Sequence, residues 1–382
     1  MSVERLRGIA GFSIDKVAAA AGADPEVLRL ENYDTDLRPP AAAVEATRRA
    51  LDSDEYNSYL PFAGREDLRA AVAARMGRLS GRAFDPRDEV LICSGGTEGM
   101  LDVLLATVET GDEVILTDPT YAGMINRVRL AGGVPRFVPF VERAGEWKLD
   151  LEALRGVVTN RTRMVFVMNP VTPNGAVLGD EEWTEIAELC ERNNLLLLYN
   201  AAFERILYDG RKYRHPASYA GLAERTITVG SVSKEYRMIG WRIGWIAGPH
   251  EWMGDVAKVR IYNVVTPPGA NQAGAHVALT AAADGLAACI AEWQARRDVV
   301  REELGEFGII SAAGGWSMVL DVRRFGMDGP TASERLLARG KIAATPMKNW
   351  GERNSSAFVR IVFSNEPVAR LRGLRERVLR SY

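Results

Sequence analysis

One lysine in the middle of the chain lies in surroundings that suit covalent chemistry with a carbonyl compound. An apolar run with strand character, Arg225–Val229, leads into a turn of small residues that presents Lys234. Glycines follow at close spacing, and Arg242 stands eight residues after the lysine. An amine that attacks a carbonyl needs a rigid turn, close approach of the backbone and a cation that holds an anionic ligand. This stretch supplies all three, and the competing interpretation is a surface lysine beside a helix.

A candidate anion site precedes the lysine in the chain. The loop Ser94–Glu98 follows an apolar strand and begins a helix, and Gly95 and Gly96 leave backbone N–H groups free to point at an anion. The loop lacks the GxGxxG spacing of a dinucleotide site, because Thr97 follows the glycines directly. The pattern predicts an anion site and gives no support to a nicotinamide oxidoreductase.

A second cation stands near the C-terminus in an apolar run. Phe358–Ser364 places Arg360 among valine, isoleucine and phenylalanine residues. A buried arginine is costly unless an anion pairs with it, and its planar guanidinium suits a carboxylate. We expect Arg360 to hold an anion, with a structural salt bridge as the competing interpretation.

The elements that must position these residues follow an alternating pattern. From residue 89 onward, short apolar runs alternate with helical segments, which predicts βαβ units and a mostly parallel sheet covered on both faces. The predicted strands are 90–93, 114–116, 136–138, 164–168, 195–199, 225–229 and 244–247, separated by helices at 97–108, 122–131, 151–157 and 180–193. Further predicted helices are 14–30, 41–51, 65–79, 273–307, 331–339 and 367–379, with strands near 316–322 and 358–363.

Length and composition exclude several classes of protein. A chain of 382 residues exceeds what one hydrophobic core usually holds, so we expect two subdomains. The net charge of -2 gives no electrostatic footprint for nucleic acid or an anionic membrane. No apolar run reaches the length of a membrane span, and residues 1–16 mix charged with apolar side chains, which predicts no signal peptide.

The cysteines and histidines give no sign of a metal site or of a disulfide framework. They are few and far apart: Cys93, Cys190, Cys289, His215, His250 and His276. Their separation gives no metal-ligand spacing, and an odd number of scattered cysteines favours a reducing cytoplasm.

The lysine segment resembles that of the fold-type I pyridoxal 5'-phosphate (PLP) enzymes, in the class I/II aminotransferase superfamily of the aspartate aminotransferase type. The residues in register are Ser231, Ser233, Lys234, Gly240, Arg242 and Gly244. The resemblance covers nearly the whole chain and implies an α/β fold with a mostly parallel central sheet in a large domain, plus a small α+β domain. It implies an N-terminal arm with part of the small domain at 1–49, a large PLP-binding domain at 50–285 and a C-terminal small domain at 286–382.

The resemblance also implies roles for individual residues. Lys234 would form the Schiff base with PLP and then move the substrate's α-proton as a general base. The cofactor phosphate would lie against Gly96, Thr97, Ser231 and Arg242. Tyr121 would stack on the cofactor ring, and Arg360 would bind the carboxylate of an amino acid substrate. The implied assembly is a cytoplasmic homodimer in which Tyr59 reaches the phosphate of the neighbouring subunit.

Three positions depart from the family's pattern around the cofactor ring. Thr172 replaces an asparagine and Phe203 a tyrosine, both of which bind the phenolic oxygen in the family, and Asn200 replaces the aspartate that pairs with the ring nitrogen. A carboxylate favours the protonated ring, which serves as the electron sink, whereas an amide gives no such bias. Tyr33 stands in the family's N-terminal glycine loop, near the substrate carboxylate, and suggests an unusual substrate pocket.

These departures leave three interpretations open. The first, which we favour, is an aminotransferase with altered cofactor electronics. The second is another PLP reaction: elimination or replacement at Cβ or Cγ, or carbon–carbon bond formation, in specialised biosynthesis. The third is a catalytically weak or ligand-sensing relative. The sensor is disfavoured, because only about forty residues precede Pro39-Pro40 and they have no basic bias.

Overall fold

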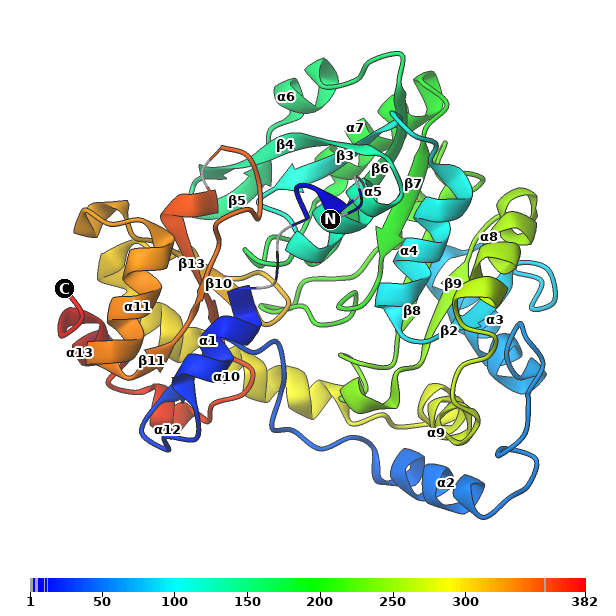
Figure 1. Cartoon of the computed structure of the whole chain (residues 1–382), viewed down its shortest axis with the longest axis horizontal. Helices are drawn as coiled ribbons and strands as arrows, with labels where there is room; N and C mark the ends of the chain where they lie inside the picture. The colour runs from blue at the N-terminus through cyan, green and yellow to red at the C-terminus, as the bar shows by residue number, and fades with distance from the viewer. Residues whose placement is uncertain (1–2, 4–5, 10, 12, 354) are drawn as a thin grey trace.

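A computed structural model describes residues 3, 6–9, 11, 13–353 and 355–382 (Figure 1). The stretch 1–16 and the predicted range 1–49 therefore fall partly outside the described residues, at positions 1–2, 4–5, 10 and 12. None of the described helices combines the length and the apolar character needed to cross a lipid bilayer.

The centre of the molecule is an eight-stranded sheet with the strand order β2-β9-β8-β7-β6-β3-β4-β5. Its strands are β2 (Val90–Cys93), β3 (Glu113–Asp118), β4 (Val134–Arg143), β5 (Glu146–Leu149), β6 (Thr162–Met168), β7 (Leu196–Asn200), β8 (Thr226–Ser231) and β9 (Gly244–Ala247). The five strands from β8 to β4 run parallel, while β9, β2 and β5 pair antiparallel at the two ends. The predicted mostly parallel sheet is confirmed.

Both faces of this sheet are buried. Along β7, Leu196 and Leu198 belong to one hydrophobic core, while Leu197 and Tyr199 belong to another. Successive side chains of a strand point to opposite faces, which explains why the strand sequences are apolar without a break. The helices of this part are α4 (Gly96–Thr107), α5 (Ala122–Leu130), α6 (Leu151–Gly156), α7 (Asp180–Arg192) and α8 (His250–Asn263).

Two segments far apart in the sequence, one at 13–29 and one that begins at residue 286, form a smaller layer beside the large sheet (Figure 1). A three-stranded antiparallel sheet has the order β10-β13-β12, and β1 pairs parallel with β11. These strands are β1 (Leu28–Arg29), β10 (Ser317–Asp321), β11 (Ile342–Ala343), β12 (Thr345–Pro346) and β13 (Phe358–Val362). The accompanying helices are α1 (Ser13–Ala21), α10 (Leu286–Leu304), α11 (Gly329–Gly340), α12 (Val368–Leu371) and α13 (Leu374–Leu379). The distribution of strands is compatible with the predicted domains 1–49, 50–285 and 286–382, which stay a prediction.

The remaining helices lie near the β2 and β9 end of the large sheet, where α3 contacts both strands. They are α2 (Ala41–Leu51), α3 (Glu66–Ser80) and α9 (Gly269–Thr280), and α9 contacts both α2 and α3. Short 3-10 turns occur at η2 (Pro216–Ser218), η3 (Ile239–Trp241), η4 (Gly305–Phe307), η5 (Arg323–Phe325) and η6 (Ser355–Ala357).

Three helix predictions were wrong in extent. The predicted helix 14–30 ends at Ala21, because the backbone N–H groups of Leu28 and Leu30 donate instead to the carbonyl oxygens of Lys341 and Ala343. The predicted helix 273–307 is two helices, since Gly285 adopts a φ of 68° between α9 and α10. The predicted helix 367–379 is likewise divided at Gly373, with a φ of 81°. Tertiary pairing and left-handed glycines override helical periodicity at these places.

Candidate active site

A cavity of about 240 Å³ opens where the parallel strands end. The residues beyond the carboxyl ends of β6, β7 and β8 meet at the same edge of the sheet, the usual place for ligands in an open α/β fold. Eleven of the twelve sequence-predicted site residues line this cavity. They are Tyr33, Gly96, Thr97, Tyr121, Thr172, Asn200, Phe203, Ser231, Lys234, Arg242 and Arg360.

Lys234 lies in the turn that follows β8, with its amine inside the cavity. Its Nζ donates a hydrogen bond of 2.6 Å to the main-chain oxygen of Tyr33. The rings of Tyr33, Phe203 and Trp316 surround it, with centroids 5.3, 5.9 and 5.0 Å from Nζ. Burial lowers the pKa of Lys234 to about 7, with Arg360 and Arg242 adding to the decrease. A substantial share of this amine is therefore neutral, and nucleophilic, near pH 7.

The turn that carries Lys234 is held from behind by buried ion pairs. Arg75 of α3 pairs with Glu204, which follows β7, and its Nη2 lies 3.0 Å from an oxygen of Glu235. Arg205 donates to the same Glu235 carboxylate at 2.7 Å. These pairs join the segment after β7 to the residue next to Lys234. Removing one member would leave buried charge without a partner, so the network fixes the lysine turn.

The first anion site lies at the N-terminus of α4. Gly95 has a φ of 80°, and a Cβ atom there would fall 2.3 Å from Nη2 of Arg242. Arg242 Nη2 also lies 3.4 Å from the Thr97 hydroxyl oxygen. Ser231, at the end of β8, faces the same cavity. A helix N-terminus, a close guanidinium and two hydroxyl groups together suit a phosphate.

The second anion site is centred on Arg360 in β13. Its side chain is 2% exposed, and Nη2 donates to the carbonyl oxygen of Glu31 at 2.5 Å and to the Thr345 hydroxyl at 3.4 Å. Its Nε has no partner within the described residues. Burial lowers its pKa to about 10. A guanidinium without a carboxylate partner, facing a cavity, suits an anionic ligand, and no structural salt bridge is found for it among the described residues.

The three positions that depart from the family's pattern all face the cavity. Asn200, at the end of β7, donates from Nδ2 to the sulfur of Met100 at 3.4 Å and accepts from the backbone of Ala202 at 3.1 Å. The Thr172 hydroxyl lies 2.8 Å from that of Tyr33. Phe203 is 1% exposed and offers no hydrogen bond from its side chain. The cavity therefore presents the amide of Asn200 at the end of β7, the position where the resemblance implies an acid in the family.

Several lining residues were not predicted from the sequence. They are Ile14, Met100, Met168, Ala202, Ser233 and Ile239. Most are apolar, and an apolar residue at a strand end or on a helix gives no signal that separates a cavity wall from ordinary core. The sequence gives a partial signal only for Met168, which ends the predicted strand 164–168. In the structure it ends β6 directly beside Asn200.

Tyr59 is the one predicted site residue outside the cavity. Its side chain is 80% exposed. Among the other exposed large hydrophobic side chains are Phe62, Tyr262 and Val265. The loop of Tyr59 and Phe62 is tied to the segment that follows α8, because Gln272 accepts from the backbone N–H of Arg65 and donates to the carbonyl oxygen of Pro267.

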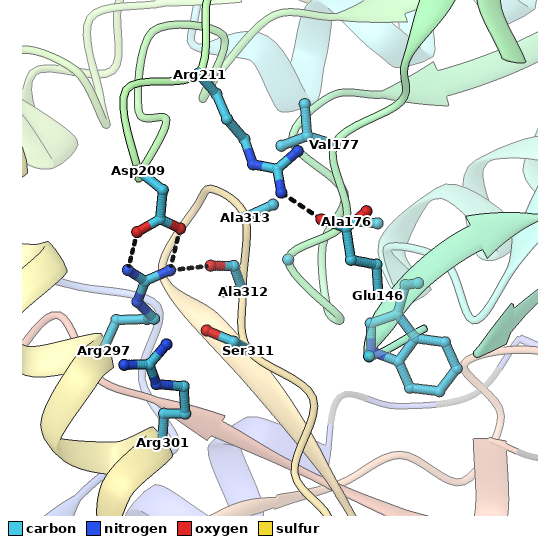
Figure 2. A pocket seen from close by; sticks show the side chains of 13 residues that line it. Glu146, Ala176, Val177, Asp209, Arg211, Arg297, Arg301, Ser311, Ala312 and Ala313 are labelled. Carbon is cyan, nitrogen blue, oxygen red and sulfur yellow. Dashed lines mark hydrogen bonds and ion pairs between the residues drawn. The ribbon is translucent and has the colours of Figure 1, made fainter. Parts of the chain in front are cut away.

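A separate pocket of about 140 Å³ lies between the turn at 209–211 and α10 (Figure 2). Arg297 donates to both carboxylate oxygens of Asp209, at 2.8 and 2.7 Å, and to the oxygen of Ala312 at 2.8 Å. Arg211 pairs with Glu146 on the opposite wall. Because these charges pair with one another, we assign the contacts a structural role: they hold α10 against the large sheet.

The cavity fits PLP, a molecule with a phosphate, an aldehyde and an aromatic ring. Gly95 leaves space that a Cβ would fill beside Arg242, and the lysine amine is desolvated at the wall. Of the seventeen lining residues, three are cationic and none is acidic. That composition matches one anionic cofactor and one anionic substrate group.

The chain is similar to known aminotransferases over nearly its whole length. The family "Aminotransferase class I and II" matches residues 25–378. The chain is 33% identical over 350 residues to the "Probable N-succinyldiaminopimelate aminotransferase" of Mycobacterium tuberculosis, which covers 91% of this chain and 88% of that protein. It is 29% identical over 365 residues to an aspartate aminotransferase of Pyrococcus abyssi, covering 94% and 93%. The solved structure of N-succinyldiaminopimelate aminotransferase from M. tuberculosis superposes with a TM-score of 0.93 at 30% identity, covering 100% of both chains.

Proposed function

The chain belongs to the class I and II aminotransferases, and from that membership we propose how its cavity residues divide the transfer of an amino group from an amino acid to a 2-oxo acid. The relatives support transamination over elimination, replacement or carbon–carbon bond formation. The enzyme uses PLP, as the family does. When bound, PLP carries the amino group and accepts the electron pair released at the substrate's α-carbon.

The observation that carries the assignment is the convergence of three cations on one cavity without an acid. Lys234 is the residue that joins the cofactor aldehyde and later moves the α-proton, since its amine is held at the cavity with a pKa near 7. Gly96, Thr97, Ser231 and Arg242 hold the phosphate. Lys234 Nζ takes the α-proton and returns it to a different atom, which is general acid–base work at a pKa matched to neutral pH.

Arg360 binds the α-carboxylate of the substrate in this assignment, and Tyr121, which also lines the cavity, would stack on the ring of PLP. After Lys234, Arg242 and Arg360 are used, the lining described for this chain has no further charged side chain. Ile14, Ile239, Met100 and Met168 make much of the remaining wall. This composition favours an amino acid with an uncharged side chain.

The proposed assembly is a homodimer that covers the exposed Tyr59, Phe62, Tyr262 and Val265. The side chains of Tyr59 and Tyr262 are 80% and 91% exposed, which is unusual for large aromatic groups on a monomer. Tyr59 would reach the phosphate of the neighbouring subunit. A cytoplasmic location is supported by the three cysteines, all of which are free thiols.

The test is a pairing experiment with substrates. The protein is supplied with PLP, a 2-oxo acid and one amino acid at a time, and the nitrogen of each amino acid is isotopically labelled. We expect the label to move to the 2-oxo acid and the donor to become its own 2-oxo acid, fastest for donors with uncharged side chains. Release of ammonia or loss of a side-chain group without label transfer would contradict the assignment.

A further inference from the structure

The phenol of Tyr33 lies beside Thr172 and Phe203, the two positions where the resemblance implies other side chains that bind the phenolic oxygen of PLP. Its hydroxyl lies 2.8 Å from Thr172 Oγ1 and 3.3 Å from the hydroxyl oxygen of Ser317. Its ring meets Phe203 edge-on, with centroids 5.3 Å apart and an angle of 67° between the planes. A tyrosine hydroxyl from the N-terminal segment thus lies where Phe203 presents only hydrocarbon.

Contacts on several sides fix the position of Tyr33. Its carbonyl oxygen accepts the 2.6 Å hydrogen bond from Lys234, and the guanidinium of Arg360 stands 4.9 Å from its ring centroid. Trp316 packs against it with centroids 6.0 Å apart. Lys234 therefore holds the main chain of Tyr33 while Arg360 faces its ring, so the groups that define the cavity also position this residue.

The pair of hydroxyl groups compensates for the short side chain of Thr172. A threonine hydroxyl stands one bond from Cβ, whereas the amide of the family's asparagine stands further out. The Tyr33 hydroxyl lies one hydrogen bond beyond Thr172 Oγ1, so the pair extends the reach of position 172 into the cavity. Each hydroxyl both donates and accepts. Tyr33 can therefore accept a hydrogen bond from Thr172 and donate its own hydrogen to a ligand, or the two residues can exchange these roles.

We propose that Tyr33, coupled to Thr172, donates the hydrogen bond to the phenolic oxygen of PLP that Phe203 cannot make. The inference rests on the proposed function, because it places PLP in this cavity. It assigns Tyr33 to the cofactor, in contrast to the expectation from the sequence that Tyr33 binds the substrate. A hydrogen bond to the charged form of an oxygen favours that form. Tyr33 therefore lowers the pH at which the visible spectrum of the lysine-bound cofactor changes.

The test is a spectrophotometric pH titration of the PLP-loaded protein without substrate. Tyr33→Phe and Thr172→Val should each raise the midpoint by about one pH unit, which corresponds to about a tenfold change in proton affinity. The double variant should shift it no further than the larger single shift, because the two hydroxyl groups act as one unit. Tyr208→Phe is the matched control, since Tyr208 is a buried phenol in the same core that donates to Gly315 at 2.5 Å and does not line the cavity.

Restoring the family's phenol gives a second arm. Phe203→Tyr in the Tyr33→Phe background should return the midpoint toward that of the wild type. Normal PLP uptake with an unmoved midpoint in Tyr33→Phe, together with a raised KM for the amino acid, would overturn the inference and assign Tyr33 to the substrate. A wild-type chain that gains no visible band with PLP would instead refute the proposed function, and this inference with it.

Discussion

The amine nitrogen of Lys234 lies 2.6 Å from the carbonyl oxygen of Tyr33, a residue 201 positions earlier in the chain. The acceptor is a neutral carbonyl and not a carboxylate, so the contact gives little electrostatic support to a charged amine. The surrounding aromatic rings remove water from the nitrogen. A neutral acceptor and a shell of aromatic rings together leave the charged form of Lys234 poorly stabilised at the cavity.

The pKa of Lys234 can be measured in the protein free of PLP. Its acylation by acetic anhydride, followed by peptide mass spectrometry, should rise with pH through a midpoint of about 7, because burial disfavours the charged amine. Lys258 provides the internal control, since it is exposed beside Asp255, which raises its pKa. Equal pH profiles for Lys234 and Lys258 would contradict a desolvated amine.

Removing the amine should remove the covalent bond to the cofactor. Lys234→Ala should eliminate the visible band of the PLP-loaded protein and the covalent attachment of PLP by borohydride reduction. It should also reduce turnover by about a hundredfold or more, as expected when a general base is lost. Lys258→Ala should behave as wild type. An unchanged spectrum and a reduced peptide that carries PLP elsewhere would remove Lys234 from the proposed role.

Much of the architecture could be predicted because its strands have a clear sequence signature. Continuous apolar runs such as Val90–Cys93 and Gly244–Ala247 have the same bounds in the structure as in the prediction. The helix α8 was not predicted. The strand β5 was not predicted either, since Glu146–Leu149 is short and amphipathic and pairs only with β4. Pairings between the two ends of the chain, such as Leu28 with Ile342, depend on tertiary contacts that no local pattern reports.

The candidate site, like the fold, could be predicted only in part from the sequence. Lys234 and Arg242 could be located from the sequence because they stand in a glycine-rich turn after a strand. Arg360 could be located because a cation in an apolar run is costly unless an anion pairs with it. The placement of Tyr33 could not, because its bond to Thr172 joins segments 139 positions apart. The wall formed by Ile14 and Met100 looks like ordinary core in the sequence.

The amide at position 200 should limit how well the cofactor ring is protonated. Asn200→Asp places a carboxylate at the end of β7, and a carboxylate shifts a neighbouring group's pKa by about one to three units toward the charged form. We expect the exchange of the substrate's α-hydrogen with deuterated water to become faster and the cofactor spectrum to change. Asn193→Asp, on the far end of α7, is the control. If neither property changes, residue 200 does not lie at the ring.

The buried guanidinium at position 360 should govern substrate affinity. Arg360→Lys keeps a positive charge but loses the planar fork, and Arg360→Ala loses both, so KM for the amino acid should rise in that order. For alanine we expect a loss of about 2–5 kcal/mol in kcat/KM, with PLP affinity unchanged. Arg323→Ala, whose partner is Asp321 on the surface, should have no effect on KM. Wild-type KM in Arg360→Ala would exclude Arg360 from the substrate site.

The role of Tyr59 can be tested because the proposed homodimer places it and Lys234 of the same chain in different active sites. A Lys234→Ala subunit and a Tyr59→Ala subunit should each form poorly active homodimers at limiting PLP. In a mixed dimer one of the two sites contains both Lys234 and Tyr59, so unfolding and refolding the variants together should restore activity. Size-exclusion chromatography with light scattering checks that dimers form in every sample. Dimers that form without recovering activity would show that the exposed phenol of Tyr59 does not complete the neighbouring site. Recovery would require Tyr59 of one subunit to act in the active site of the other.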